Sequence, residues 1–285
     1  MVEPAQRPTA PSDRFRRTRS IEAMGKRAGR LPLGRARRWL KHAYHAALML
    51  QTGGRGLRCV LPGGEVVRVL PEHRYLSWNP AEYVAFRSTV RPGMVALDVG
   101  ANVGAYSLLL GRWTGPSGAV FAFEPAPDPF NGLVRHIHLN GLDDVVKPMR
   151  LAIGDASSNA RLLLAGTAGE SRLATAVDSS ASIVTVPVTT IDEFCAQERI
   201  EPDFIKIDIE GFELAALRGA RETIRARRHA LSLFVEMHPT LWPTLGLLQA
   251  DILEELRIQS LDPVSLVPSA DIWATEGMCL RLVPR

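Results

Sequence analysis

The stretch Val95-Ala-Leu-Asp98-Val-Gly100-Ala-Asn102-Val-Gly104 decides the fold that we expect for this chain of 285 residues. An apolar run ends at Asp98 and leads into a glycine-rich turn, which is typical of a buried strand followed by a tight loop and a helix. The spacing Gly-x-x-x-Gly differs from the dinucleotide pattern Gly-x-Gly-x-x-Gly, and no Gly-Lys-Ser/Thr follows as in a phosphate-binding loop. An acidic side chain before the loop would repel a pyrophosphate, whereas it suits a cationic sulfonium amino acid.

From residue 94 onwards, short apolar runs alternate with stretches of helical pattern. The expected strands are 95–99, 119–123, 145–152, 204–209 and 231–236, and the expected helices are about 103–112, 128–140, 190–198 and 213–226. This alternation predicts an α/β fold, Rossmann-like, with a mostly parallel sheet flanked by helices. The segment 160–188 interrupts the alternation, and we expect two extra strands there, 161–165 and 183–188, around a polar loop.

A second acidic residue stands at the end of the next expected strand. In Phe121-Ala-Phe-Glu124-Pro125, Glu124 follows Asp98 by 26 residues, which is the length of one strand–helix–strand unit. A carboxylate at this place in a nucleotide-binding fold accepts hydrogen bonds from two ribose hydroxyls. Glu124 is therefore a candidate ribose-binding residue.

Two later strands end in charged residues, Lys206-Ile-Asp208-Ile-Glu210-Gly211 and Glu236-Met-His238. Alternate residues of a strand share a face and neighbouring strands lie about 5 Å apart, so Asp208, Glu210, Glu236 and His238 are expected to converge above the sheet. Three interpretations remain open. The cluster could supply a general base for an acceptor hydroxyl; Asp208, Glu236 and His238 could hold a divalent cation; or Lys206 and Asp208 could pair while His238 caps a loop.

Taken together, these motifs resemble the FkbM-type methyltransferase family over about residues 75–240. The resemblance rests on Asp98-Val-Gly-Ala-Asn-Val-Gly104, Phe123-Glu124-Pro125, Leu139-Asn140, Ala152-Ile-Gly154, Thr190-Ile-Asp192 and Lys206-Ile-Asp-Ile-Glu-Gly211, in the family's order. It implies a class I methyltransferase fold, S-adenosylmethionine as the methyl donor, and O-methylation of a sugar, glycolipid or secondary-metabolite hydroxyl. The expected acceptor is thus a small molecule or a glycoconjugate.

The resemblance also implies roles for individual positions. Asp98, Gly100, Asn102 and Gly104 would line the methionine end of the cofactor, Glu124 would hold the ribose, and the backbone of Ala152 would lie near the adenine. Asp208 and Glu210-Gly211 would face the reacting centre, with Glu236 and His238 opposite.

The first 56 residues lie outside this resemblance and are expected to form a basic, partly disordered leader. Residues 1–55 hold 13 Lys and Arg against three acidic residues, a net charge of +10, whereas the remainder has a net charge of −6. An amphipathic helix over 31–50 would place Trp39, Leu40, Ala43, Ala47 and Leu50 on one face. Such an arm is either a solvated extension or a contact with nucleic acid or an anionic membrane surface.

The remaining segments complete the expected organisation. A hairpin of 57–61 and 66–70 around Pro62-Gly63-Gly64, and a helix that starts at Asn79-Pro80, form a small N-terminal extension of a methyltransferase domain over 57–285 with its core at about 90–245. The three cysteines are far apart and lack metal-binding spacing, and no apolar run could cross a bilayer, so we expect a cytoplasmic protein, peripheral to the inner membrane surface if the leader binds there.

Two other function classes fit the sequence less well than O-methylation. An amino-group methyltransferase acting on nucleic acid would carry Asp/Asn-Pro-Pro-aromatic after the fourth strand, where this chain has Asp208-Ile-Glu-Gly, and its acidic body disfavours nucleic acid as a partner. A non-catalytic protein with the cofactor fold would be expected to lack Asp98, Glu124 or Asp208, all of which are present.

Overall fold

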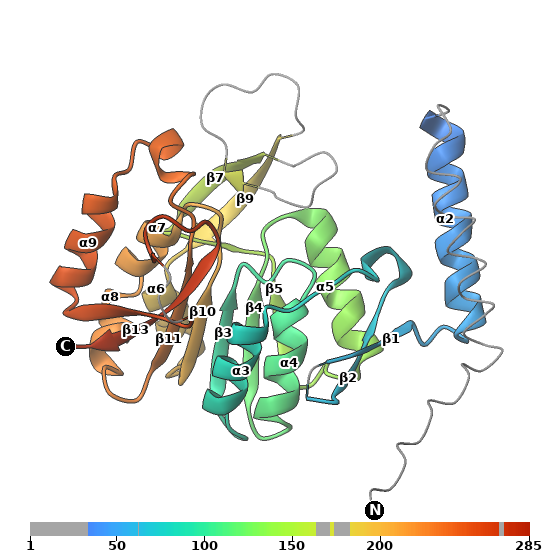
Figure 1. Ribbon diagram of the computed structural model, residues 1–285, viewed down its shortest axis with the longest axis horizontal. Helices are drawn as coiled ribbons and strands as arrows, with labels where there is room; N and C mark the ends of the chain where they lie inside the picture. Colours follow the sequence, from blue (N-terminus) through green and yellow to red (C-terminus); the bar gives the residue numbers. More distant parts are fainter. Residues whose placement is uncertain (1–33, 62, 164–171, 174–182, 268–270) are drawn as a thin grey trace, which may run out of the picture.

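The computed structural model describes residues 34–61, 63–163, 172–173, 183–267 and 271–285. A seven-stranded sheet forms its centre (Figure 1). In sheet order its strands are β12 (Leu261–Ser265), β13 (Met278–Pro284), β11 (Ser232–Met237), β10 (Phe204–Ile207), β3 (Val95–Val99), β4 (Ala119–Phe123) and β5 (Val146–Met149). The five strands from β11 to β5 are parallel, and β13 runs antiparallel to both β11 and β12. The expected α/β fold with a mostly parallel sheet is confirmed.

Helices cover both faces of this sheet (Figure 1). One face is covered by α3 (Pro80–Thr89), α4 (Ala105–Thr114) and α5 (Pro127–Leu139), and the other by α6 (Ile191–Glu198), α7 (Glu213–Arg218), α8 (Arg221–Ala226) and α9 (Gln249–Ile258). Successive strand residues enter opposite layers: Leu97 packs with the α6 and α7 side, and Ala96 with the α4 side. Because both layers are apolar, the strands read as continuous apolar runs in the sequence.

The expected single strand 145–152 is wrong. β5 ends at Met149, and the chain continues into β6 (Ala152–Ile153), which belongs to a second sheet of order β6-β9-β7-β8. The other strands of that sheet are β7 (Ser158–Leu163), β8 (Arg172–Leu173) and β9 (Ile183–Thr189). The change occurs because Ala152 pairs with Val188 of β9 and not with the edge of the central sheet. The two extra strands expected in this region are present as β7 and β9, and Ala165, at the end of the first, lies outside the described residues.

The expected helix 213–226 is also wrong as one element, because it is divided between α7 and α8 at Gly219. A Cβ at Gly219 would lie 2.1 Å from the carbonyl oxygen of Gly154. The Asp192 N–H donates to the carbonyl of Gly219, and the Asp192 carboxylate accepts from the N–H groups of Glu222 and Thr223 at the start of α8. Asp192, a residue of the family-like motif, therefore caps a helix.

The N-terminal extension contains the elements that the sequence predicted. β1 (Leu57–Val60) and β2 (Val66–Val69) form the antiparallel hairpin, and the Asn79 side chain accepts from the Ala81 N–H at the start of α3. The helix expected over 31–50 is present as α2 (Gly34–Gln51), and the leader before residue 34 lies outside the described residues. Within the described part of the chain, no helix is both long and apolar enough to span a bilayer.

His136 joins this extension to the core. The Leu70 N–H donates to Nε2 of His136 over 2.9 Å, so Nδ1 carries the proton and donates to the carbonyl oxygen of Val103 over 2.7 Å. Val103 belongs to the glycine-rich loop, and the neighbouring Asn140 side chain bonds to the backbone N–H and C=O of Arg68 in β2. His136 is fully buried, and this burial lowers its pKa to about 4. One neutral imidazole thus connects the hairpin, α5 and the loop after β3.

We expect acid to destabilise the fold through His136. In the unfolded chain the imidazole binds a proton near its ordinary pKa of 6.5, whereas in the folded chain it stays neutral down to a pH of about 4. Between these two pH values the unfolded chain binds more protons, so a fall in pH favours unfolding. The shift predicts a loss of about 3 kcal/mol in the free energy of unfolding as the pH falls from 6.5 to 4.

This loss can be measured by urea unfolding at several pH values for His136→Gln and, as a matched control, His229→Gln, whose side chain is exposed. The difference in stability between wild type and His136→Gln should shrink as the pH falls, and His229→Gln should not reproduce this change. Parallel pH curves for wild type and His136→Gln would show that His136 does not carry this effect.

Candidate functional site

Two loops cross at the carboxyl ends of β3 and β10. Gly100 has a φ of 85°, and a Cβ there would lie 1.7 Å from the backbone oxygen of Asp208. Asn102 and Glu210 also adopt positive φ, at 49° and 50°, which few non-glycine residues do. The loop that follows β3 is therefore held against the loop that follows β10, and both carry strained backbone.

Two buried carboxyl groups lie beside the first loop, Asp98 in β3 and Glu124 directly after β4. Oδ2 of Asp98 accepts from the Ser107 hydroxyl, while Oδ1 is buried and has no hydrogen-bond partner among the described residues. Glu124 accepts the N–H of Asn102 on Oε2 over 2.9 Å and that of Ala126 on Oε1 over 2.8 Å. Burial raises the pKa of Glu124 to about 7, although both backbone hydrogen bonds oppose this rise. Each of these carboxyl groups has acceptor capacity that the described chain does not use.

The other predicted cofactor residues lie close by. Gly104 begins α4 with a φ of 92°, and a Cβ there would lie 2.7 Å from Cδ1 of Leu133. Ala152 is buried and packs with Ala126, which directly follows the Glu124-Pro125 pair. The structure therefore gathers Gly104, Glu124 and Ala152 around the carboxyl ends of β3, β4 and β5.

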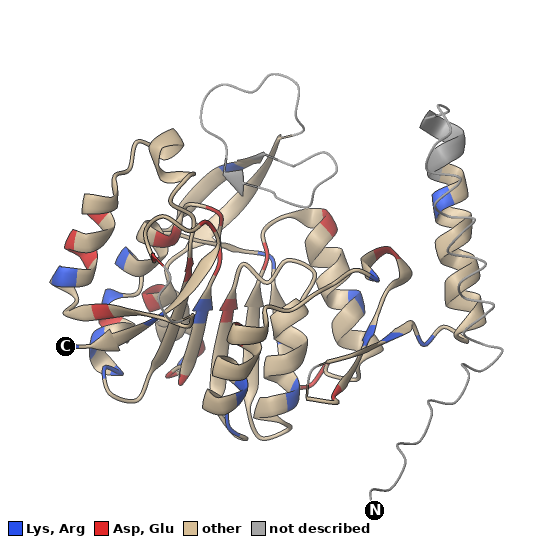
Figure 2. Cartoon of the chain, viewed as in Figure 1, with Lys and Arg blue, Asp and Glu red and all other residues tan. Residues whose placement is uncertain are grey.

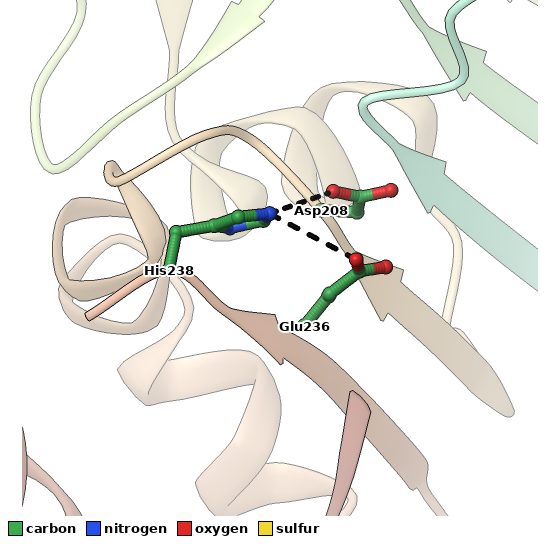
Figure 3. Close-up of side chains that lie close together, drawn as sticks. All are labelled: Asp208, Glu236 and His238. Atoms are coloured by element: carbon green, nitrogen blue, oxygen red, sulfur yellow. Dashed lines mark ion pairs between the residues drawn. The ribbon is translucent and has the colours of Figure 1, made fainter. Parts of the chain in front are cut away.

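The residues expected to converge do so: Figure 3 shows Asp208 and Glu236 beside His238, and Glu210 lies near the same imidazole. Nε2 of His238 lies 3.8 Å from a carboxylate oxygen of each of Asp208, Glu210 and Glu236. Burial and the charge of Asp208 raise the pKa of Glu236 to about 8. One imidazole nitrogen therefore points into a space bounded by three carboxyl groups.

Glu213 orients this imidazole, and the sequence analysis assigned it no role. Its Oε1 lies 2.9 Å from Nδ1 of His238 and 2.7 Å from the Gly211 nitrogen, and its Oε2 accepts from the Trp242 indole over 3.0 Å. Burial opposes a charge on His238, but this hydrogen bond and the nearby carboxylates raise its pKa to about 9. Both oxygens of the Glu213 carboxyl group thus have hydrogen-bond partners within the protein. The contact with Nδ1 orients the His238 ring so that Nε2 faces the cluster.

Lys206 is the cation at the centre of the cluster. Its ammonium group is buried, lies 2.9 Å from Oδ2 of Asp208, and its pKa is raised despite burial by the charges of Asp208, Asp98 and Glu236. The pairing of Lys206 with Asp208 that the sequence suggested is therefore present. Glu82 lies in α3, the helix expected to start at Asn79-Pro80, and is buried beside this group, where the charge of Lys206 acts on it. A glutamate in the first turn of a helix is common, so the sequence does not predict that Glu82 is buried beside Lys206.

Comparison with known proteins matches residues 98–260, more than half of the chain, to the family described as Methyltransferase FkbM domain. The hexuronic acid methyltransferase AglP of Haloferax volcanii is 26% identical over 144 residues, which are 50% of this chain and 56% of AglP. The chain thus matches about half the length of this relative.

Two solved structures are also similar. The methyltransferase FkbM of Methylobacillus flagellatus has 20% identity and a TM-score of 0.43, with 71% of this chain and 50% of that protein covered. The O-methyltransferase of Bacillus cereus, solved in complex with SAH, has 11% identity and a TM-score of 0.43, with 74% and 84% covered.

The crossing of the two loops predicts that Gly100→Ala is much more harmful than an alanine at another glycine of positive φ. The new methyl group would overlap the Asp208 carbonyl, so the loops must separate, at a cost of about 3 kcal/mol or more. Gly141→Ala is the matched control, because Gly141 has a φ of 65° and no atom within 4 Å of its added Cβ; its expected cost is about 1–2 kcal/mol of backbone strain. Urea unfolding measures both losses, and equal losses would contradict a tight contact between the loops.

Proposed function

The chain belongs to the FkbM methyltransferase family, so its domain is an S-adenosylmethionine-dependent methyltransferase domain, and we propose that it methylates a hydroxyl oxygen of a sugar, glycolipid or secondary metabolite. The observation that carries the proposal is the oriented His238 between Asp208, Glu210 and Glu236, because a neutral hydroxyl must lose its proton when its oxygen is methylated. A sugar is favoured among these acceptors because AglP is a hexuronic acid methyltransferase.

The cofactor would be held by the loop after β3 and the end of β4. We assign its methionine end to Asp98, Gly100, Asn102 and Gly104, its ribose to Glu124, and the surroundings of its adenine to Ala152. The unpartnered Oδ1 of Asp98 supports this assignment, because a buried acceptor without a donor is costly unless a ligand supplies one. Glu124 supports it as well, since each of its oxygens accepts only one backbone N–H and can accept a ribose hydroxyl in addition.

The domain is proposed to extend over residues 57–285, beyond the matched range 98–260. The hairpin supports this extent because Leu70 and Arg68 bond to His136 and Asn140 of the core. Helix α3 supports it because Phe86 packs in the same apolar cluster as Phe204 and Phe234 of the sheet.

S-adenosylmethionine supplies a methyl group that its sulfonium charge activates. The protein would hold the acceptor oxygen in line with that group, and we assign the hydroxyl proton to Nε2 of His238 in its neutral form. Because the pKa of His238 is raised to about 9, this form is the minor one at neutral pH, and turnover through this base should rise with pH up to about 9. Glu213 would fix the imidazole through Nδ1, and the carboxylates around Nε2 would stabilise the imidazolium that forms.

A second way of activating the hydroxyl is supported by one further observation. Asp208, Glu236 and His238 each offer a ligand atom, and these atoms lie within 4.8 Å of one another. Carboxylate oxygens and imidazole nitrogen suit Mn²⁺ well, and the hydrogen bond from His238 to Glu213 is the outer-shell contact usual for a metal-bound histidine. A divalent cation bound there would increase the acidity of the hydroxyl.

Glu124 provides the test of the cofactor assignment. We expect S-adenosylhomocysteine to bind the wild type and raise its melting temperature. Glu124→Gln should weaken this binding by about 1–3 kcal/mol, because one charged acceptor for the ribose is lost. Calorimetry measures the affinity, the melting temperature without ligand checks the fold, and Glu198→Gln, at an exposed site, is the control. Unchanged affinity in a folded Glu124→Gln protein would remove the ribose assignment.

His238 provides the test of the chemistry. With radiolabelled S-adenosylmethionine and a panel of sugars, glycolipids and hydroxylated metabolites, we expect label on a hydroxyl-bearing acceptor. With that acceptor, His238→Ala should lower turnover by about 10²–10⁴-fold, and Asp208→Asn similarly, while affinity for the cofactor product changes little. The exposed His229→Ala is the matched control and should retain full activity. Full turnover in both site variants would show that the acceptor is activated elsewhere.

Chelation separates the two modes of activation. If EDTA abolishes turnover and Mg²⁺ or Mn²⁺ restores it, the cation interpretation of Asp208, Glu236 and His238 holds. If EDTA leaves turnover unchanged while His238→Ala still lowers it, His238 acts as the base.

A further inference from the structure

Helix α2 carries an apolar face that nothing in the described part of the chain covers. Trp39 is 70% exposed and Leu50 81% exposed, and Leu40, Ala43 and Ala47 are exposed beside them. The spacing of these five residues places them on one side of the helix. The opposite side faces the body of the protein, where Leu48 is buried and His45 lies 3.3 Å from the Arg74 guanidinium. The helix is thus anchored by one face and exposes its apolar face to solvent.

This helix is also strongly basic. Its sequence contains Arg35, Arg37, Arg38 and Lys41 and no acidic residue. Residues 1–55 carry a net charge of +10, whereas the rest of the chain carries −6. Figure 2 shows α2 at the side of the molecule, with the acidic groups concentrated in the rest of the fold. An anionic surface would therefore attract this end of the protein and repel its body.

We propose that α2 binds the surface of an anionic lipid membrane. The face formed by Trp39, Leu40, Ala43, Ala47 and Leu50 enters the boundary between headgroups and acyl chains, and the basic side chains contact lipid phosphates. Tryptophan suits such a boundary because its ring is apolar and its N–H is polar. The 18 residues of α2 lie in the plane of the membrane, since the helix does not meet the requirements of a spanning segment. This binding is independent of the methyl acceptor.

Two other occupants fit the helix less well. A second copy of the chain would bring two segments of net charge +10 together, and this repulsion opposes pairing through α2. A nucleic acid would neutralise the basic residues but leave Leu40 and Leu50 in water, because phosphate contacts use charge and not aliphatic surface.

The test is cosedimentation of the full 285-residue chain with sucrose-loaded vesicles. We expect binding to vesicles of phosphatidylcholine and phosphatidylglycerol, at least about 10-fold weaker binding to phosphatidylcholine alone, and weakening when NaCl rises from 0.1 to 0.5 M. The double variant Trp39→Ala/Leu50→Ala should bind the anionic vesicles at least about 10-fold more weakly, because it removes most of the exposed apolar area.

The matched control is Val84→Ala/Leu248→Ala, which removes two apolar side chains that are 65% and 66% exposed elsewhere on the molecule. This control should bind vesicles like the wild type, and both double variants should keep the wild-type melting temperature. Equal binding by Trp39→Ala/Leu50→Ala, or equal binding to neutral and anionic vesicles, would overturn the proposal. Two further outcomes would overturn the proposal if the chain does not bind vesicles. A dimer in size-exclusion chromatography that depends on Trp39 and Leu50 would favour a second copy of the chain. Binding of a single-stranded RNA that depends on the same residues would favour a nucleic acid.

Discussion

The buried ammonium group of Lys206 is the charge on which the whole site depends. Burial opposes this charge, but the negative charges of three carboxylates at the ends of neighbouring strands raise the pKa of Lys206. These carboxylates belong to Asp208, Asp98 and Glu236. An unpaired charge in such a place would cost several kcal/mol, and so would three carboxylates without a cation. Lys206 and its carboxylates therefore stabilise one another, and the sheet can concentrate acidic groups at its carboxyl edge without unfolding there.

The strained loops follow from the same arrangement. Lys206 stands beside Asp98 in the parallel pairing of β10 with β3, and the chains that leave these two strands are in contact at Gly100 and Asp208. Gly100 permits this close approach because it has no Cβ. Asn102, two residues after Gly100, and Glu210, two residues after Asp208, take left-handed conformations. Glu210 then lies 3.8 Å from the His238 imidazole, and Gly211 donates to Glu213. Two of the non-glycine residues with left-handed backbone thus line the proposed site, while Arg199 and Ser260 adopt this conformation elsewhere among the described residues.

These relations explain how far the sequence could predict the structure. The strands 95–99 and 119–123 and the convergence of Asp208, Glu236 and His238 follow from apolar runs and strand ends, which are local signals. The division of 145–152 and of 213–226 depends on Val188 and Gly154, partners that lie far away in the chain, and no local pattern reveals them. Local sequence also fails to predict the roles of Glu213 and Glu82, because each stands in the context of an ordinary helix start. It fails for His136 as well, because one of its partners directly follows β2 and the other lies in the glycine-rich loop.

The two signs of charge are concentrated in different segments of the chain, and we relate one segment to cofactor binding and the other to surface binding. The segment 57–285 has a net charge of −6, and under the proposed assignment its buried carboxyl groups would face a cofactor whose sulfonium is cationic. Thirteen of the 34 Lys and Arg residues precede residue 56 in the sequence, and the described part of this segment includes α2, where Leu48 is buried and His45 lies beside Arg74. Moving the positive charge into the catalytic segment would weaken the field that favours a cationic ligand. Keeping it on α2 instead leaves that field intact and makes a second, oppositely charged surface available for binding.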